Sequence, residues 1–234
     1  MVSISADNVT LTYHLRQRSL LSKMFARSRE APSLKRIDAL KGVSFELRAG
    51  DRLGLVGANG SGKTTLLKVL YGIYEASSGR VCVNGRVDAL FNINLGFRAE
   101  ATGRRNILLR GLINGWSPDE IEAKTNEIIE FSELGDFIEL PYKAYSQGMA
   151  ARLAFSIATT LEPEILLMDE WIGAGDPNFQ QKAKQRMDAL AEKAGIIVLA
   201  SHNHRLIRQT CTKVMELRQG QMVQLLDIGD WKDD

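Results

Sequence analysis

Three uninterrupted apolar runs mark the places along this chain where buried strands are expected. They cover residues 53–56, 165–168 and 196–200. Strands that are covered on both faces give runs of this kind, because neither face meets water, and this is typical of central parallel strands. The first run leads into a helical pattern over residues 65–70. These segments predict an α/β core.

Shorter strands are predicted before and after the first run. Residues 2–13 alternate loosely between apolar and polar side chains and predict an edge strand, and residues 43–47 predict a second strand. Residues 80–83 and 86–91 flank an Asn-Gly dipeptide, which favours a tight turn, so they predict a β-hairpin. The chain therefore starts with a β-rich region.

From about residue 102 to residue 158 the pattern turns helical, which predicts a helical insertion between two of the core strands, with a helical subdomain at about 98–158. Ser117 and Glu120 have the spacing of a capping box, and Pro118 stands at the first helical position. A helix is therefore expected to begin at this point.

The turn after the first buried strand has the spacing of a phosphate-binding loop. Residues 57–64 read G-x-x-x-x-G-K-T between a predicted strand and a predicted helix, which is the setting that the motif requires. Glycines allow successive N–H groups to turn inward around a phosphate, and the helix dipole adds to the attraction. Lys63 would reach the β and γ phosphates and the Thr64 hydroxyl would hold Mg²⁺. A glycine-rich turn with a chance lysine is the alternative, which the correct flanks disfavour. The expected nucleotide-binding residues of this segment are Gly57, Asn59, Gly60, Ser61, Gly62, Lys63, Thr64 and Thr65.

Two carboxylates follow the second buried run. Ligands of open α/β sheets lie at the carboxyl ends of the strands, so Asp169 is expected to hold Mg²⁺ and Glu170 to polarise the attacking water. Many strands end in an acidic turn, so the two carboxylates alone would be a weak signal. They indicate a nucleotide site because the phosphate-binding loop is also present. His202, after the third run, is a candidate hydrogen-bond partner of the γ phosphate, although a lone histidine is more often structural.

A second candidate anion site precedes another helical pattern. Ser146 and Gly148 form a Ser-x-Gly turn at the expected N-terminus of that helix. A plain helix cap is the alternative interpretation.

Composition places the chain among ordinary globular proteins. Its 234 residues, 44% of them hydrophobic and 25% charged, fit one large α/β domain or two small ones. No apolar run approaches the ~20 residues that cross a bilayer, and residues 1–10 lack a targeting pattern, so a soluble cytoplasmic chain is expected. Cys82 and Cys211 are expected as free thiols, and a net charge of +2 does not by itself indicate nucleic-acid binding.

In their order and spacing, these motifs resemble the ATP-binding subunits of ABC transporters over nearly the whole chain. The resemblance implies an α/β P-loop ATPase with an N-terminal antiparallel β subdomain, an α/β core and a helical insertion, all within one nucleotide-binding domain over residues 1–234. It also implies that the chain hydrolyses ATP with Mg²⁺ as cofactor. The implied motifs are Walker A at 57–64, Walker B at 165–170, the signature at 145–149, the D-loop aspartate at Asp176 and the switch histidine at His202.

Two further positions follow from the resemblance. Tyr13 matches the aromatic residue that stacks on adenine in this family, and packing of Tyr13 on the sheet is an equal alternative. Asn92 stands where a glutamine usually links the nucleotide to the membrane partner, and it is a candidate metal ligand there. Asparagine is shorter than glutamine, which puts a direct contact with Mg²⁺ in doubt.

Within this family, the chain resembles one group of exporters more closely than the others. Residues 94–107 resemble a segment of the bacterial exporters of O-antigen, capsule and teichoic acid, and Tyr-Ser-x-Gly-Met at 145–149 is typical of the same group. This implies a subunit that powers export of a polysaccharide or lipid-linked glycan of O-antigen type from the cytoplasmic face of the inner membrane. The implied partner is a transmembrane channel subunit, in two copies, which makes most of the contacts with the polysaccharide. An importer or lipid-exporter subunit is the alternative. A soluble ABC-type ATPase is less favoured, because no basic or aromatic stripe suits nucleic acid.

The resemblance also implies that two copies of the chain work together. In this family the signature covers the γ phosphate that a second copy binds, in a two-fold homodimer with two nucleotides. Each site would combine residues of one subunit, Lys63, Thr64, Asp169, Glu170 and His202, with Ser146, Gly148 and Asp176 of the other.

An insert at about residues 14–37 is basic and carries four apolar residues at 20–25 that would share one face of a helix. Such a helix could lie on anionic lipid or on the membrane partner, and a solvated excursion between two strands is an equal alternative. At the other end, strand-like segments at 214–217 and 222–225 come just before the last residues. No C-terminal carbohydrate-binding domain is therefore expected.

Overall fold

The computed structural model describes the chain except for residues 18–32, 92, 94–95, 171–176 and 233–234. The chain divides into two compact units. The first unit comprises residues 1–85 and 198–234, and the second comprises residues 86–197. Strand β7 (Ile196–Ala200) begins in the second unit and ends in the first.

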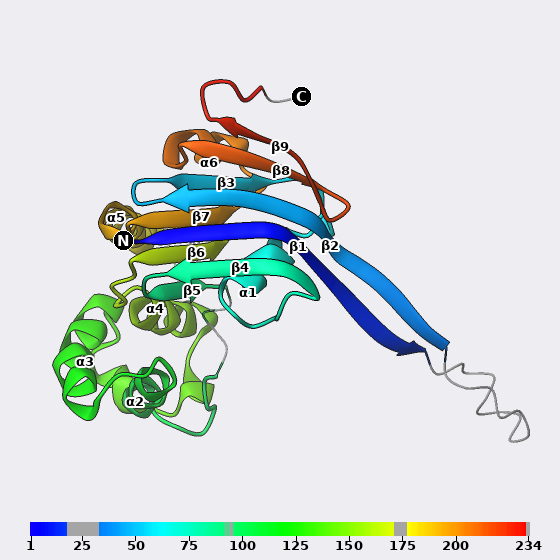
Figure 1. Ribbon diagram of the computed structural model, residues 1–234. Helices are drawn as coiled ribbons and strands as arrows, with labels where there is room; N and C mark the ends of the chain where they lie inside the picture. The colour runs from blue at the N-terminus through cyan, green and yellow to red at the C-terminus, as the bar shows by residue number, and fades with distance from the viewer. Residues whose placement is uncertain (18–32, 92, 94–95, 171–176, 233–234) are drawn as a thin grey trace, which may run out of the picture. The chain divides into compact units, whose positions relative to one another are not determined.

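A three-stranded antiparallel sheet of order β2-β1-β4 belongs to the first unit (Figure 1). Its strands are β1 (Ser3–Gln17), β2 (Ser33–Arg48) and β4 (Ser78–Asn84). β1 lies in the middle, so the prediction of an edge strand at residues 2–13 is wrong. Alternation reports which face of a strand is buried, and it does not report whether both edges are paired.

The alternation of β1 is interrupted once. Ile4 and Ala6 are buried, and Val9 is buried again after Asn8, which has a φ of 49° and lies at a register shift. The extra residue at this irregularity keeps the apolar side chains on the core face.

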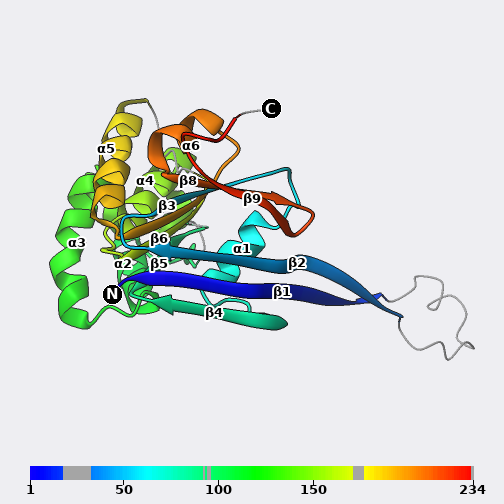
Figure 2. The same cartoon turned by 45° about the horizontal axis from the view of Figure 1, so that its top comes forward.

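Beyond the β1–β4 pairing, β1 and β2 continue alone as a two-stranded ribbon as far as the pair Gln17↔Ser33 (Figure 2). Residues 35–38 of this ribbon are exposed. The insert expected at about 14–37 thus begins and ends as strand. The segment predicted to be helical, at 20–25, lies outside the described residues.

The hairpin predicted over residues 80–91 is wrong. β4 pairs antiparallel with β1, with Cys82 opposite Ser5, whereas β5 (Val87–Leu90) pairs in parallel with β6 (Ile165–Asp169). An Asn-Gly turn reverses the chain locally, but burial against distant segments decides which strands pair.

The remainder of the first unit contains parallel and antiparallel pairs. β3 (Arg52–Val56) pairs in parallel with β8 (Lys213–Arg218), which pairs antiparallel with β9 (Gln221–Asp227). Helix α1 (Lys63–Leu70) follows β3, and α6 (His204–Thr210) follows β7. These elements confirm the strands and the helix predicted for this part of the chain.

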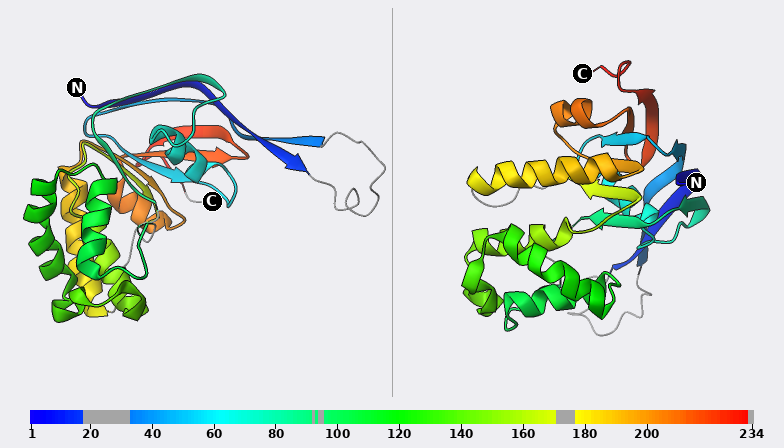
Figure 3. Two further views of the ribbon diagram at one scale, coloured as in Figure 1. Left: turned by 90° about the horizontal axis from the view of Figure 1, so that it is seen from below. Right: turned by 90° about the vertical axis from the view of Figure 1, so that its left-hand side faces the viewer.

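Helices dominate the second unit, and α2, α3 and α4 lie side by side in it (Figure 3). Ile107, Ile128 and Leu153 are fully buried in its core. The capping box is confirmed, since Ser117 and Glu120 bond each other's backbone N–H. The elements are α2 (Gly103–Ile113), α3 (Pro118–Ser132), α4 (Gln147–Ala158) and α5 (Pro177–Lys193), with short 3₁₀ turns η2 (Gly135–Glu139) and η3 (Tyr142–Ala144).

In the described part of the chain, none of the helices combines the length and the apolar character that crossing a membrane requires.

Candidate functional site

The loop between β3 and α1 has a backbone suited to surrounding a phosphate. Gly57, Gly60 and Gly62 have φ values of 140°, 79° and 112°, a region that other residues rarely adopt. A Cβ at Gly57 would lie 2.1 Å from the carbonyl oxygen of Leu217, so no side chain fits there. The glycine spacing of the motif therefore follows from this loop conformation.

Helix α1 begins differently from the other α-helices whose N-caps are described. Its N-cap is Gly62, and no side-chain hydrogen bond caps it. Side-chain oxygens of Thr102, Ser117, Ser146 and Asn203 cap α2, α3, α4 and α6. A helix N-terminus without its own cap is suited to an anion, because its first N–H groups have no partners within the helix.

Lys63 supplies a buried positive charge to the loop. Its side chain is 7% exposed, and Nζ donates hydrogen bonds to the carbonyl oxygens of Gly57 at 2.7 Å and Ala58 at 3.2 Å. A buried ammonium is stabilised by an anionic partner. The loop therefore fits a phosphate group.

Ser61 gives an independent sign of a ligand. Its hydroxyl is buried and has no hydrogen-bond partner among the described residues, although buried polar groups are normally paired. Its carbonyl oxygen accepts a hydrogen bond from Gly220 N at 2.9 Å, and Gly220 has a φ of 83° and packs against Ala39. Sequence reasoning missed this support of the loop by the β8–β9 turn. The Gln219-Gly220 pair between two predicted strands was the available signal.

Tyr13 packs edge-on against Tyr74, with ring centroids 5.6 Å apart and an interplanar angle of 83°. Burial raises the pKa of Tyr13, a hydrogen bond with Thr65 lowers it, and the neighbouring Tyr74 raises it further. Tyr13 thus lies against α1, at the end of the phosphate-binding loop. Its stacking on a base stays a prediction.

His202 lies two residues after the end of β7 and is exposed. The preceding Ser201 is buried and donates its N–H to the carbonyl oxygen of Leu55 on β3 at 3.3 Å, which anchors the histidine's backbone. A hollow of about 300 Å³ is lined by His202 together with Gly57 and Ala58 of the loop. The first unit therefore brings the predicted switch histidine and the phosphate-binding loop to one hollow.

Asp169 and Glu170 lie at the carboxyl end of β6, in the second unit. Asp169 is partly buried and Glu170 is exposed. Glu170 has a φ of 76°, which is uncommon for a residue with a side chain and is concentrated at functional sites. Nothing in the sequence indicated this conformation.

Ser146 and Gly148 begin helix α4, and both are exposed. The Ser146 hydroxyl oxygen accepts a hydrogen bond from Met149 N at 3.2 Å. The structure thus places Ser146 as a helix cap, which is compatible with both interpretations given for it.

The tyrosine before this serine has a fitted place in the second unit. The Tyr145 hydroxyl donates to the carbonyl oxygen of Phe137 at 2.9 Å, and a Cβ at Gly103 would lie 2.1 Å from that hydroxyl. Two features of the exporter resemblance, Tyr145 in the signature and Gly103 in the 94–107 segment, are therefore in contact.

The same segment is ordered by Asn106, which is fully buried. Its side chain accepts from Arg98 N and donates to the carbonyl oxygens of Arg98, Ala101 and Thr102. Beside it, a groove of about 560 Å³ is lined by Gly96, Phe97, Arg98, Leu109, Leu112 and Ile113. Sequence reasoning did not predict this groove.

The remaining predicted residues cannot be compared with the structure, because Asn92 and Asp176 lie outside the described residues. Among the residues that the structure describes, no three His, Cys, Asp or Glu side chains are grouped as a metal site. Mg²⁺ keeps water and phosphate oxygens as ligands and needs only one or two protein oxygens, so Thr64 and Asp169 suit it in kind.

Both cysteines are free thiols, as predicted. Of the predicted site residues, the structure places Tyr13, residues 57–65 and His202 in the first unit. It places Ser146, Gly148, Asp169 and Glu170 in the second.

Comparison with known proteins gives matches over most of the chain. The family model described as ABC transporter matches residues 40–173. The O-antigen export system ATP-binding protein RfbE of Yersinia enterocolitica is 41% identical over 229 residues, which cover 94% of this chain and 96% of RfbE. The teichoic acids export ATP-binding protein TagH of Enterococcus faecalis is 42% identical over 79% of this chain, but the match spans only 41% of TagH.

Solved structures give the same result for the fold. The dimeric ATP-binding cassette MJ0796, in a post-hydrolysis state bound to ADP and Pi, has a TM-score of 0.70 at 21% identity over 96% of this chain and 98% of its own. A structure described as the ATP-binding subunit of an ABC transporter has a TM-score of 0.72 at 21% identity, over 97% of this chain and 90% of its own. The predicted fold class is thereby confirmed, and the chain belongs to the ABC transporter family.

Proposed function

We propose that this chain is the ATP-hydrolysing subunit of an ABC transporter that exports a polysaccharide or lipid-linked glycan of O-antigen type. The observation that carries the proposal is the 41% identity to RfbE over nearly the full length of both chains. RfbE is named an O-antigen export protein, and other relatives are named for teichoic acid export. The glycine loop with its buried lysine supplies the physical basis for ATP binding.

ATP binding rests on the first unit. The N–H groups of the loop and the Lys63 ammonium, which is held at the loop carbonyls, would receive the β and γ phosphates. The unpaired Ser61 hydroxyl would gain a phosphate oxygen as partner. Tyr13 would stack on the adenine, a contact that tolerates any base because every base has an aromatic face.

Hydrolysis needs a positioned water and neutralised charge. Glu170 would polarise the attacking water, and its φ of 76° is of the uncommon kind that is concentrated at functional sites. His202 would hydrogen-bond the γ phosphate. Mg²⁺, held by the Thr64 hydroxyl and the Asp169 carboxylate with Asn92 as a further candidate ligand, would neutralise the phosphate charge.

Two copies of the chain would form the working ATPase. Ser146, Gly148 and Asp176 of one copy would contact the γ phosphate that the other copy binds, so that ATP stabilises the dimer and hydrolysis releases it. The dimeric state of the related MJ0796 cassette supports this arrangement.

The dimer would be a peripheral protein at the cytoplasmic face of the inner membrane. It would bind two copies of a transmembrane channel subunit, and that subunit would make most of the contacts with the polysaccharide. The groove beside Phe97 supports this, because Leu112 and Ile113 are 52% and 64% exposed there and Arg98 lines it. An apolar groove with a basic wall suits a cytoplasmic helix of the channel that has an apolar and an acidic side. No nucleic acid is part of the proposal.

Residues 1–234 are proposed to be one nucleotide-binding domain, with the helical subdomain at about 98–158. The basic insert at about 14–37 is proposed to contact lipid headgroups or the channel subunit.

The experiment is the substitution Glu170→Gln, which removes the carboxylate and keeps the shape. The expected result is a loss of ATP turnover of about 10²–10⁴-fold, the range for one general base, with ATP affinity little changed and ATP-dependent dimers accumulating. Glu162→Gln, at an exposed glutamate ahead of β6, is the matched control and should keep full turnover. Undiminished turnover of Glu170→Gln would remove Glu170 from this role.

A further inference from the structure

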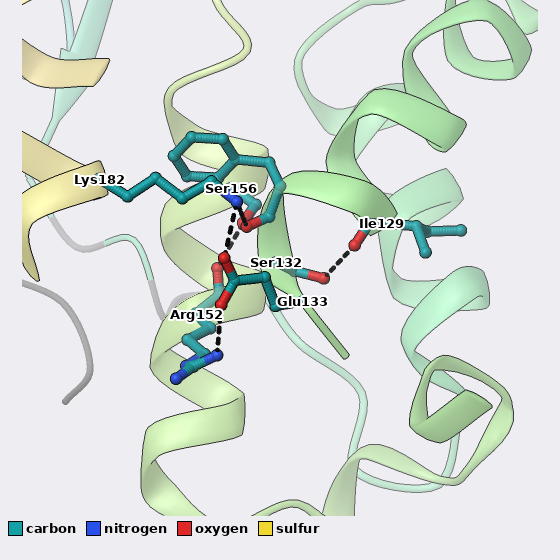
Figure 4. A network of polar contacts seen from close by, with 7 residues as sticks. Ile129, Ser132, Glu133, Arg152, Ser156 and Lys182 are labelled. Carbon is teal, nitrogen blue, oxygen red and sulfur yellow. Dashed lines mark hydrogen bonds and ion pairs between the residues drawn. The ribbon is translucent and has the colours of Figure 1, made fainter. Parts of the chain in front are cut away.

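A single carboxylate joins three helices of the second unit. Glu133, the C-cap residue of α3, accepts hydrogen bonds from Lys182 of α5 at 2.9 Å and from Arg152 of α4 at 3.0 Å, on its two different oxygens. Figure 4 shows the carboxylate between the two cations. Lys182 also donates to the carbonyl oxygen of Phe131, near the end of α3, at 3.1 Å.

The backbone of Glu133 is specialised for this position. Its φ of 56° lies in the left-handed region, which glycine usually occupies at the end of a helix. Gly135 follows two residues later with a φ of 52°. A glutamate in this conformation costs conformational free energy that a glycine at the same position would not cost.

Aromatic rings lie beneath the charges, one from each helix. Phe131 of α3, Phe155 of α4 and Phe179 of α5 are in mutual contact, with centroid separations of 6.2, 5.6 and 5.9 Å. The Lys182 ammonium lies 4.6 Å from the Phe131 ring centroid, and the Arg152 guanidinium 5.0 Å from that of Phe179. Each cation therefore touches both the carboxylate and a ring.

The charge of Glu133 also keeps two like charges together. The Arg152 and Lys182 side chains are 19% and 35% exposed, so solvent screens their mutual repulsion only in part. The Glu133 carboxylate offsets this repulsion, because it lies within hydrogen-bond distance of both cations. Aromatic contacts and the hydrogen bonds of Arg186 to Glu127 and to the carbonyl oxygen of Thr159 also join these helices, and the two bonds to Glu133 add charge-assisted contacts of defined geometry.

The helices that meet at Glu133 are those that follow the signature and the D-loop segment. α4 begins directly after Ser146, and α5 begins at Pro177. We propose that Glu133 is a positioning residue that fixes α4 on α5, so that Ser146 and Gly148 reach the nucleotide of a second copy in one defined arrangement. This inference rests on the proposed ATP-dependent dimer.

The test uses the full-length chain carrying Glu170→Gln, in which ATP is not hydrolysed and dimers accumulate. Into this chain Glu133→Gln is introduced, and the dimer dissociation constant is measured with saturating Mg-ATP by analytical ultracentrifugation. The affinity of the monomer for ATP is measured separately at a protein concentration below dimer formation. We expect the dimer to weaken about tenfold, a typical coupling between sites, with monomer affinity within about twofold of the parent.

Two further variants separate positioning from general effects. Lys182→Arg keeps the cation and should retain dimerisation, whereas Lys182→Met should weaken it, a difference that the loss of apolar packing alone does not give. Glu139→Gln removes another exposed carboxylate of this unit, one that pairs only with Arg104 among the described ion pairs, and should leave the dimer unchanged.

The outcomes are distinct. If the Glu170→Gln parent forms no ATP-dependent dimer, the proposed dimer itself fails. If the parent dimerises and Glu133→Gln dimerises equally well, or Glu139→Gln weakens the dimer as much, the positioning role of Glu133 is overturned. A parallel loss of monomer ATP affinity in Glu133→Gln also overturns it, because the effect would then be a general one.

Discussion

At the scale of single residues, Glu170 and Glu133 share an uncommon property. Both are glutamates whose backbone has a positive φ, of 76° in Glu170 and 56° in Glu133. Such a conformation costs of order 1–3 kcal/mol and persists only where the surroundings fix it. Each of them follows the last residue of a regular element, β6 or α3, so the backbone changes direction at that residue.

The two cysteines differ in environment, which gives a prediction at this scale. Cys82 is exposed, whereas burial raises the pKa of the Cys211 thiol to about 12. Thiolate is the reactive form, so iodoacetamide at pH 8 is expected to alkylate Cys82 and to spare Cys211 until the chain unfolds. Mass spectrometry of labelled peptides, with Cys82→Ser as control, measures this. Rapid labelling of Cys211 in the folded chain would contradict the prediction.

The same shift affects stability at alkaline pH. The folded chain holds the Cys211 proton up to about pH 12, while the unfolded chain loses it near the ordinary value of 9.0. The contribution of Cys211 to the free energy of unfolding is therefore complete below about pH 9 and declines as the pH rises toward 12. Unfolding by urea at pH 8 and pH 10 should show a smaller decline in Cys211→Ala than in the parent chain.

Sequence patterns predicted residues that act through local geometry better than residues that act through distant contacts. The glycines of the 57–64 loop could be read directly, because their backbone requirement is local. The supporting role of Gly220 and the place of Glu133 between two cations depend on contacts with residues far along the chain. The φ of Glu170 depends on how β6 ends, and no residue pattern encodes that.

At the scale of elements, the contact between Gly103 and Tyr145 joins α2 to the start of α4. Gly103→Ala would place a Cβ 2.1 Å from the Tyr145 hydroxyl and 2.7 Å from Ile138, and overpacking of this kind costs about 1–3 kcal/mol. We expect the free energy of unfolding in urea to fall by about this amount.

Tyr145→Phe removes the hydroxyl and its hydrogen bond to Phe137, which costs about 1 kcal/mol. Because the same hydroxyl causes most of the clash, Gly103→Ala and Tyr145→Phe together should cost less than the sum of the single changes. Strict additivity would show that the hydroxyl and the glycine are not coupled.

Helices and strands whose own residues form a strong pattern were predicted well. The positions of strands that depend on pairing with distant segments were not. The helix at Ser117 and the buried strands followed from capping residues and apolar runs. The central place of β1 and the separation of β4 from β5 follow from pairing between distant segments, for which one strand's alternation carries no information.

At the scale of the whole molecule, the proposed export function would need a membrane partner, and the groove beside Phe97 is the surface proposed for it. Leu112→Asp would place a charge on its exposed apolar wall. We expect this variant to lose most of its co-purification with the channel subunit in detergent extracts while keeping ATP affinity within about twofold.

Val223→Asp is the matched control for that experiment, because Val223 is 51% exposed and lies on β9 of the first unit. Co-purification should be unaffected in this variant. Equal loss in both variants, or no loss in Leu112→Asp, would exclude the groove as the docking surface.

Helix α1 has glycine at its N-cap, where α2, α3, α4 and α6 have serine, threonine or asparagine. The missing cap can then come from solution, in the form of the ligand's own oxygen atoms. A ligand that binds the loop of the folded chain and not the unfolded chain raises the free energy of unfolding, so the chain is expected to be more stable with its ligand bound than without it.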